Sequence, residues 1–99
     1  MKRFKTYLSG PMTGRVEMNF PAFAREETRL RSLGITVVNP AANGLPANAE
    51  WQDHMREDIR LLMDCTAIHM LPGWTKSRGA TLEHTIAVAL GMAVTGAVE

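Results

Sequence analysis

The residues best suited to chemistry lie in a short polar run near the carboxyl end of the chain. Residues 77–83 read Ser-Arg-Gly-Ala-Thr-Leu-Glu, a small glycine-bearing turn that leads into a helix. A carboxylate such as Glu83, near a helix N-terminus and beside the core, can be partly desolvated and still be stabilised by the helix dipole. Such a group is suited to act as a nucleophile or general base. A first-turn glutamate favoured by the dipole alone is the alternative interpretation.

A helical wheel of this third predicted helix, at about residues 79–92, defines its apolar side. The apolar stripe consists of Leu82, Ile86, Ala89, Leu90 and Ala93. Glu83 falls at the edge of this stripe, whereas His84 points away from it. We therefore expect Glu83 at the boundary of the core and His84 in solvent.

A second carboxylate interrupts the apolar stripe of the helix predicted at about residues 50–63. Its inward positions are Trp51, Met55, Ile59 and Leu62. Asp58 projects into the middle of them, and a buried carboxylate without a partner is costly. It must therefore line a cleft, or else contact a backbone amide or an arginine. Glu27 also faces inward on the first helix, where an i,i+4 pair with Arg31 explains it.

Ser77 is placed to cap the third helix and to leave the amides of Gly79 and Ala80 beside it. Together these groups predict an anion site, a plain helix cap being the alternative. Tyr7 lies in the first predicted strand, where its hydroxyl reaches either the ligand edge or a buried partner. His54, His69 and His84 have no metal-ligand spacing among themselves or with Cys65, so no metal is expected.

Strand and helix patterns alternate along the chain. Strands are predicted at 4–8, 35–38, 67–71 and 94–98, and a first helix at about 20–33, capped by Asn19 and stopped by Gly34. Right-handed crossovers then give a flavodoxin-like α/β fold, a three-layer sandwich with a small parallel sheet of order 2-1-3-4 and helices on both faces. Ligands bind such sheets at the carboxyl ends of the strands. Asn39 and the turns at 9–14 and 71–79 fall at that edge.

Length and composition agree with one small domain over residues 1–99. The chain has 99 residues, 45% of them hydrophobic, one cysteine and a formal net charge of +1. We expect a cytoplasmic protein with no membrane segment, no disulfide and no nucleic-acid partner. So small a sheet, with Trp74 and Met92 expected to be exposed, predicts a homodimer or higher homo-oligomer.

With these residues in view, the chain resembles the nucleoside 2-deoxyribosyltransferase superfamily. It is most similar to a small subgroup of unknown function, DUF4406, that is frequent in phage and prophage genomes. The resemblance rests on residues 7–14, Asn39-Pro40, Trp51 through Ile59, Leu71 through Trp74 and Ser77 through Glu83.

The resemblance implies a role for each matched position. Glu83 would be the nucleophile that attacks the anomeric carbon of a nucleoside sugar. Asp58 would contact the sugar or base and help the leaving group accept a proton, and Ser77 would bind a 5′-phosphate. The implied pocket is completed by Tyr7, Ser9, Gly10, Pro11, Asn39, Gly79 and Ala80. No cofactor is implied.

Two departures from the superfamily bear on activity. Thr81 stands where a glycine is common, and the sequence ends at Glu99 without the C-terminal strand and asparagine that transferases use. We therefore predict a nucleoside or nucleoside 5′-monophosphate N-glycosidase, with hydrolysis favoured over deoxyribosyl transfer. The alternatives are a non-catalytic nucleotide-binding module, such as a phage sponge or regulator, and a small assembly protein that keeps only the scaffold.

Overall fold

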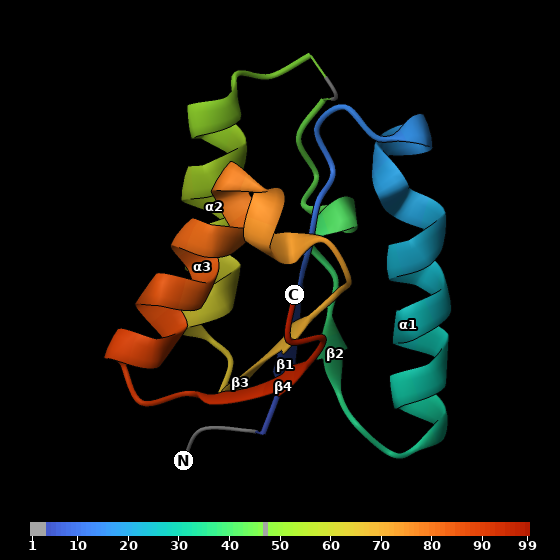
Figure 1. Cartoon of the computed structure of the whole chain (residues 1–99), viewed down its shortest axis with the longest axis vertical. Helices are drawn as coiled ribbons and strands as arrows, with labels where there is room; N and C mark the ends of the chain where they lie inside the picture. Colours follow the sequence, from blue (N-terminus) through green and yellow to red (C-terminus); the bar gives the residue numbers. More distant parts are fainter. Residues whose placement is uncertain (1–3, 47) are drawn as a thin grey trace.

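Four parallel strands form the centre of the computed structural model, which describes residues 4–46 and 48–99 (Figure 1). The strands are β1 (Thr6–Ser9), β2 (Val37–Val38), β3 (Ala67–Met70) and β4 (Ala93–Gly96). Their order in the sheet is β2-β1-β3-β4, and every neighbouring pair is parallel. The predicted order 2-1-3-4 is therefore confirmed.

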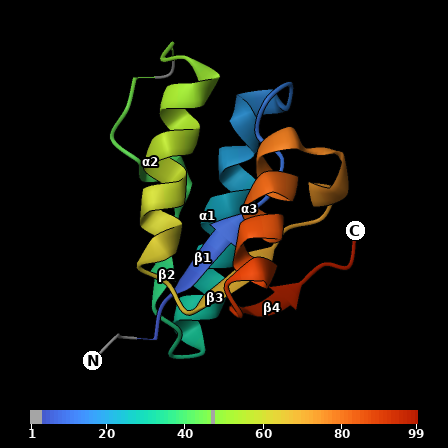
Figure 2. The ribbon, with the colours of Figure 1, turned by 90° about the vertical axis from the view of Figure 1, so that its left-hand side faces the viewer.

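Three helices connect the strands and cover both faces of the sheet. They are α1 (Phe20–Ser32), α2 (Trp51–Met63) and α3 (Arg78–Ala89). α1 lies on one face, and α2 and α3 lie side by side on the other (Figures 1 and 2). Single turns of 3-10 helix occur at Val16–Asn19, Pro40–Ala42 and Trp74–Lys76. The predicted three-layer α/β arrangement is confirmed.

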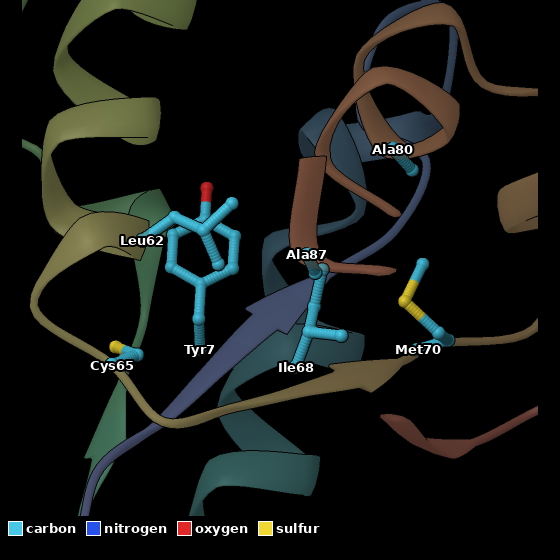
Figure 3. Packing of buried hydrophobic residues seen from close by; sticks show 7 residues of the cluster. All are labelled: Tyr7, Leu62, Cys65, Ile68, Met70, Ala80 and Ala87. Atoms are coloured by element: carbon cyan, nitrogen blue, oxygen red, sulfur yellow. The ribbon is translucent and has the colours of Figure 1, made fainter. Parts of the chain in front are cut away.

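Alternation along the strands divides the core into two clusters. Leu8 of β1 points to the α1 side and packs with Phe23 and Leu30. Tyr7 points to the opposite side and packs with residues of α2, β3 and α3 (Figure 3). Successive side chains of a strand face opposite sides of the sheet, so Tyr7 and Ser9 lie on the same side, beneath α2 and α3. This side of the sheet also faces the carboxylates of Asp58 on α2 and Glu83 on α3.

Some element boundaries differ from those predicted. β2 covers two residues rather than four, and β4 begins and ends earlier than predicted. Asn19 does precede α1, but its side chain does not cap the helix. The residues Glu17, Met18 and Asn19 all have positive φ, and Nδ2 of Asn19 donates instead to the carbonyl oxygen of Pro11, at 2.9 Å.

The expectation that Trp74, Met92 and His84 are exposed is wrong. The Trp74 indole stacks on the His84 ring with centroids 4.3 Å apart, and its Nε1 donates to the Ala97 carbonyl oxygen at 2.8 Å. Met92 packs against the core on the α2 and α3 side. The His84 ring and the Ala97 backbone therefore hold the Trp74 indole in place, which the sequence pattern did not predict. Among the described residues, no helix has the length and apolar character needed to span a bilayer.

Candidate functional site

Glu83 is a buried carboxylate at the carboxyl edge of the sheet. It lies in the second turn of α3 and is 5% exposed. Ala80 and Ala87, the other buried residues of α3, share its face. These small side chains let the helix approach the sheet closely, which brings the longer glutamate side chain over β1. The inward face is thus Ala80, Glu83 and Ala87, whereas Leu82, Ala89 and Leu90, assigned to the apolar stripe, are exposed.

Two hydroxyl groups of β1 hold both oxygens of this carboxylate. The Tyr7 hydroxyl donates to Oε2 at 2.5 Å, and the Ser9 hydroxyl donates to Oε1 at 2.7 Å. Both residues are fully buried. Because they are two positions apart on one strand, their side chains project from the same face toward the same acceptor. The alternative that Tyr7 meets a buried partner is the one the structure shows, and that partner is Glu83.

Burial dominates the electrostatics of Glu83. Loss of solvent raises the pKa of this carboxyl from 4.5 to about 7, although the hydrogen bonds from Tyr7 and Ser9 lower it and the Asp58 charge raises it further. Burial, followed by the charge of Glu83, also raises the pKa of the Tyr7 hydroxyl well above its ordinary value. The site therefore contains a carboxyl group that changes its charge near neutral pH and a tyrosine that stays protonated there.

Asp58 approaches the same region from α2. It is 8% exposed and lies between the buried residues Met55 and Leu62, so the predicted inward carboxylate is confirmed. Burial raises its pKa, and a hydrogen bond from the Asn43 amide to Oδ1, at 2.9 Å, lowers it. The Asp58 charge acts on both Glu83 and Tyr7. Two acids from different helices thus lie close enough for the charge of Asp58 to raise the pKa of Glu83.

Ser77 caps α3 as predicted. Its Oγ accepts the Ala80 amide at 3.2 Å, and its carbonyl oxygen accepts the Thr81 amide at 2.9 Å. The amide of Ala80 is therefore engaged, contrary to the expectation that it stays open for an anion. Gly79 packs closely against α2, where a Cβ would lie 3.1 Å from the Met55 sulfur.

The other predicted pocket residues shape the loops at this edge. A Cβ on Gly10 would lie 2.8 Å from the Cβ of Leu71, so β1 and β3 leave no room for a side chain there. Pro11 is buried, and its carbonyl oxygen accepts the Asn19 amide. Nδ2 of Asn39 donates to Glu27 at 3.0 Å, and its Oδ1 accepts the Ala41 amide at 2.9 Å. The Asn39 side chain thus joins α1 to the turn after β2, and Glu27 also pairs with Arg31 as predicted.

Sequence reasoning missed two groups beside the predicted residues. The Arg78 guanidinium lies 3.8 Å from the centre of the Trp51 ring, which joins the first turns of α3 and α2. Asn43 bonds to Asp58 and approaches His54. The i,i+4 spacing of His54 and Asp58 was a usable signal for the second group. The stacking of Arg78 on Trp51 had no local signal, because 27 positions separate the two residues.

A hollow of about 350 Å³ lies at the opposite edge of the sheet, where the strands begin. Its walls include Phe4, Ile35, Thr36 and Ala93. It is remote from the carboxyl ends of the strands and shares no residue with the Glu83 cluster.

Across residues 4–46 and 48–99, no three His, Cys, Asp or Glu side chains are arranged to hold a metal ion. Burial raises the pKa of the Cys65 thiol to about 11.

Comparison with known proteins identifies the family. A family model described as "Domain of unknown function (DUF4406)" matches residues 4–96. The chain belongs to this family. The resemblance drawn from the sequence is therefore confirmed for DUF4406. No curated protein matches the chain.

The fold of this DUF4406 protein is shared with solved structures. One match is a 2-deoxyribosyltransferase from the psychrotolerant bacterium Bacillus psychrosaccharolyticus, with a TM-score of 0.73 and 22% sequence identity. The alignment covers 93% of this chain and 70% of the other. At this identity the likeness shows a shared fold.

Proposed function

We propose that this DUF4406 protein is a nucleoside or nucleoside 5′-monophosphate N-glycosidase that acts through Glu83. The observation that carries the proposal is the buried Glu83 carboxylate. Each of its oxygens accepts a hydrogen bond from a hydroxyl group, and the charge of Asp58 raises its pKa. A fold shared with a 2-deoxyribosyltransferase supports the same class of substrate. The carboxyl ends of the strands are also where such sheets bind ligands.

The proposed reaction is a double displacement that needs only water as a second reactant. The ionised Glu83 carboxylate attacks C1′ of the sugar as the C1′–N bond breaks, and the electron pair of that bond stays with the base. The departing base takes a proton from water, while the Asp58 carboxylate contacts the sugar or the base. Water then attacks C1′ of the glycosyl ester, which releases the sugar, restores the Glu83 carboxylate and returns a proton to the site.

The neighbours of Glu83 have matching roles in this scheme. Tyr7 and Ser9 orient the carboxylate and favour its ionised form. Ser77 and the amide of Gly79 would receive a 5′-phosphate, for which Ser77 would exchange its bond to Ala80. Gly10, Pro11 and Asn39 would form the walls around the sugar and base. No cofactor or metal has a step in this scheme.

Base release by the purified protein tests the proposal. Ribo- and deoxyribonucleosides and their 5′-monophosphates are incubated with wild type, Glu83→Gln and, as a matched control, Glu27→Gln, and free base is measured by chromatography. We expect Glu83→Gln to lower kcat by about a thousandfold or more, and Glu27→Gln to be active. Base release that is equal in wild type and Glu83→Gln rules out the assigned nucleophile.

A second candidate is a nucleotide-binding module without turnover. It is favoured by the engagement of both Glu83 oxygens, since a carboxylate that accepts two hydrogen bonds is a weaker nucleophile. Calorimetry combined with product chromatography separates the two functions. Binding without base release, lost in Ser77→Ala and kept in Glu83→Gln, supports the module.

We also propose that two copies pair through the outer face of α3. Leu82 and Val88 on this face are 39% and 54% exposed, and Thr85 and Ala89 beside them are exposed and uncharged. The outer faces of α1 and α2 instead carry arginines paired with glutamates. An uncharged apolar face can pack against the same face of a second copy without opposing like charges, which a two-fold interface requires. Light scattering of wild type and Val88→Arg tests this: a dimer that the variant converts to monomer supports it, and a wild-type monomer contradicts it.

A further inference from the structure

The side-chain amide of Asn43 has a single chemically consistent orientation. Its Oδ1 accepts the backbone N–H of Leu45 at 3.0 Å, which requires the carbonyl oxygen on that side. Its Nδ2 then faces Oδ1 of Asp58 at 2.9 Å and Nδ1 of His54 at 3.1 Å. An amide nitrogen carries two hydrogens and no acceptor lone pair, so each neighbour receives one of them. All the bonding capacity of Nδ2 is thus used.

This orientation fixes the state of both neighbours. For Nδ1 of His54 to accept a hydrogen from Asn43, the imidazole must carry its own hydrogen on Nε2. Oδ1 of Asp58 is also an acceptor, whereas among the described residues Oδ2 has no hydrogen-bond partner and is not fully buried. His54 and Asp58 are one turn apart on α2, so a single amide from the loop after β2 bridges them. The loop is thereby tied to α2 beside the coupled carboxylates.

We propose that Asn43 is a positioning residue of the site, which orients the Asp58 carboxylate as a hydrogen-bond acceptor for the substrate, with neutral His54 as its second anchor. The contact of Asp58 with substrate rests on the proposed function, whereas the orientation of Asp58 and the tautomer of His54 do not. Under the glycosidase scheme, Oδ2 of Asp58 then accepts from a sugar hydroxyl or a base N–H group. The charged groups that bear on Asp58 are His54, which lowers the Asp58 pKa when its imidazole is protonated, and Glu57, which raises it. Asp58 in turn raises the pKa of Glu83 and of Tyr7.

Nuclear magnetic resonance of Asn43→Ala tests the positioning without reference to activity. The ¹⁵N shifts of His54 should show hydrogen on Nε2 in the wild type and a mixture of tautomers in the variant. The ¹³C titration of the Asp58 carboxyl should move to higher pH in the variant, because a donor to the ionised form is lost. Asn48→Ala, an exposed position of the same loop, is the matched control and should resemble the wild type.

A second variant keeps the test decisive if Asn43→Ala does not fold. His54→Gln leaves the Asn43 bond to Asp58 in place and should leave the Asp58 titration nearer to that of the wild type than His54→Leu does. Identical Asp58 titrations in the wild type and all folded variants, or a wild-type His54 with hydrogen on Nδ1, overturn the positioning role.

Kinetics then separate this proposal from the proposed function. If the wild type releases base, Asn43→Ala should lower kcat/KM by about 10- to 100-fold, the effect of losing a hydrogen bond to a charged group. An inactive wild type that shows the expected resonances contradicts the glycosidase and supports the positioning. Active variants with wild-type kcat/KM contradict a role for Asn43 in the reaction.

Discussion

The hydroxyl of Tyr7 donates to Oε2 of Glu83 at 2.5 Å, across 76 positions of the sequence. This bond joins the first strand of the sheet to the last helix, inside the core. Its acceptor is 5% exposed, so the bond acts where little water competes with it. A buried carboxylate held in this way is a costly feature for a domain of 99 residues, and such features are concentrated at functional sites.

The proposed nucleophile gives the reaction a defined pH dependence. Glu83 must be ionised to attack, and burial raises its pKa to about 7. We expect kcat/KM to rise with pH through this region. In Tyr7→Phe the midpoint should move higher, because a hydrogen bond that lowers the pKa is lost, and Ser32→Ala should leave it unchanged. A pH–rate profile of the three proteins measures this, and a midpoint that falls in Tyr7→Phe contradicts the assignment.

The same carboxylate should reduce stability at alkaline pH. The folded-state pKa of Glu83 is raised from 4.5 to about 7, so the folded state is stable while the group is neutral and loses stability as pH rises across that window. We expect Glu83→Gln to be more stable than the wild type by roughly 1 to 3 kcal/mol at pH 8 and similar at pH 4. Urea denaturation at both values measures the free energy of unfolding.

Glu27→Gln is a control for that measurement, because its free energy of unfolding should change in the opposite direction. Hydrogen bonds from Asn39 and Arg31 lower the pKa of Glu27, so its ionised form stabilises the fold. Its replacement should therefore reduce stability at pH 8. A Glu83→Gln variant that is less stable than the wild type at pH 8 would mean that the hydrogen bonds from Tyr7 and Ser9 outweigh burial.

The strand order and the inward position of Asp58 were predictable because their signals are local. Alternation of strands and helices restricts the topology, and the stripe of α2 is amphipathic enough to place Asp58 within it. The face of α3 was not predictable in this way. Apolar residues are spread around that helix, so periodicity could not choose between a face with leucines and one with alanines. Close packing on the sheet favours the small residues, and with them Glu83.

The hydrogen bonds of the site also could not be predicted from the sequence pattern. Tyr7 and Ser9 could be placed at the ligand edge, but their acceptor depends on how α3 packs across β1. The hydrogen bond from the Trp74 indole to the Ala97 carbonyl oxygen was equally unpredictable, because its acceptor lies in the backbone 23 positions away. Long-range pairs of this type follow from packing and not from spacing.

Gly96 ends the edge strand β4, where a side chain has no room. Its φ is +93°, and an added Cβ would lie 2.3 Å from the carbonyl oxygen of Met70. Gly91 has a similar φ of +73°, with nothing within 4 Å of such a Cβ. We expect Gly91→Ala to cost about 1 kcal/mol through backbone strain alone, and Gly96→Ala roughly 3 kcal/mol because a clash is added. Thermal unfolding of both variants measures the difference, and equal losses would show that the backbone of β4 moves away freely.

On the α1 side of the sheet, buried His69 links that helix to β4. Its Nε2 lies 2.6 Å from Oε2 of Glu26, and its Nδ1 lies 2.8 Å from the hydroxyl of Thr95. The Arg29 guanidinium, helped by His69, lowers the pKa of Glu26 from 4.5 to about 2. A lowered folded-state pKa stabilises the fold above pH 4.5, and this contribution disappears as pH falls toward 2.

We therefore expect Glu26→Gln to cost roughly 1 to 3 kcal/mol at pH 7 and much less at pH 2.5. Glu57→Gln, which removes a similar surface pair with Arg60, should cost less at pH 7 because no buried partner is left behind. Urea denaturation at the two pH values measures both variants, and equal losses for Glu26→Gln at pH 7 and 2.5 would mean that its charge does not stabilise the fold.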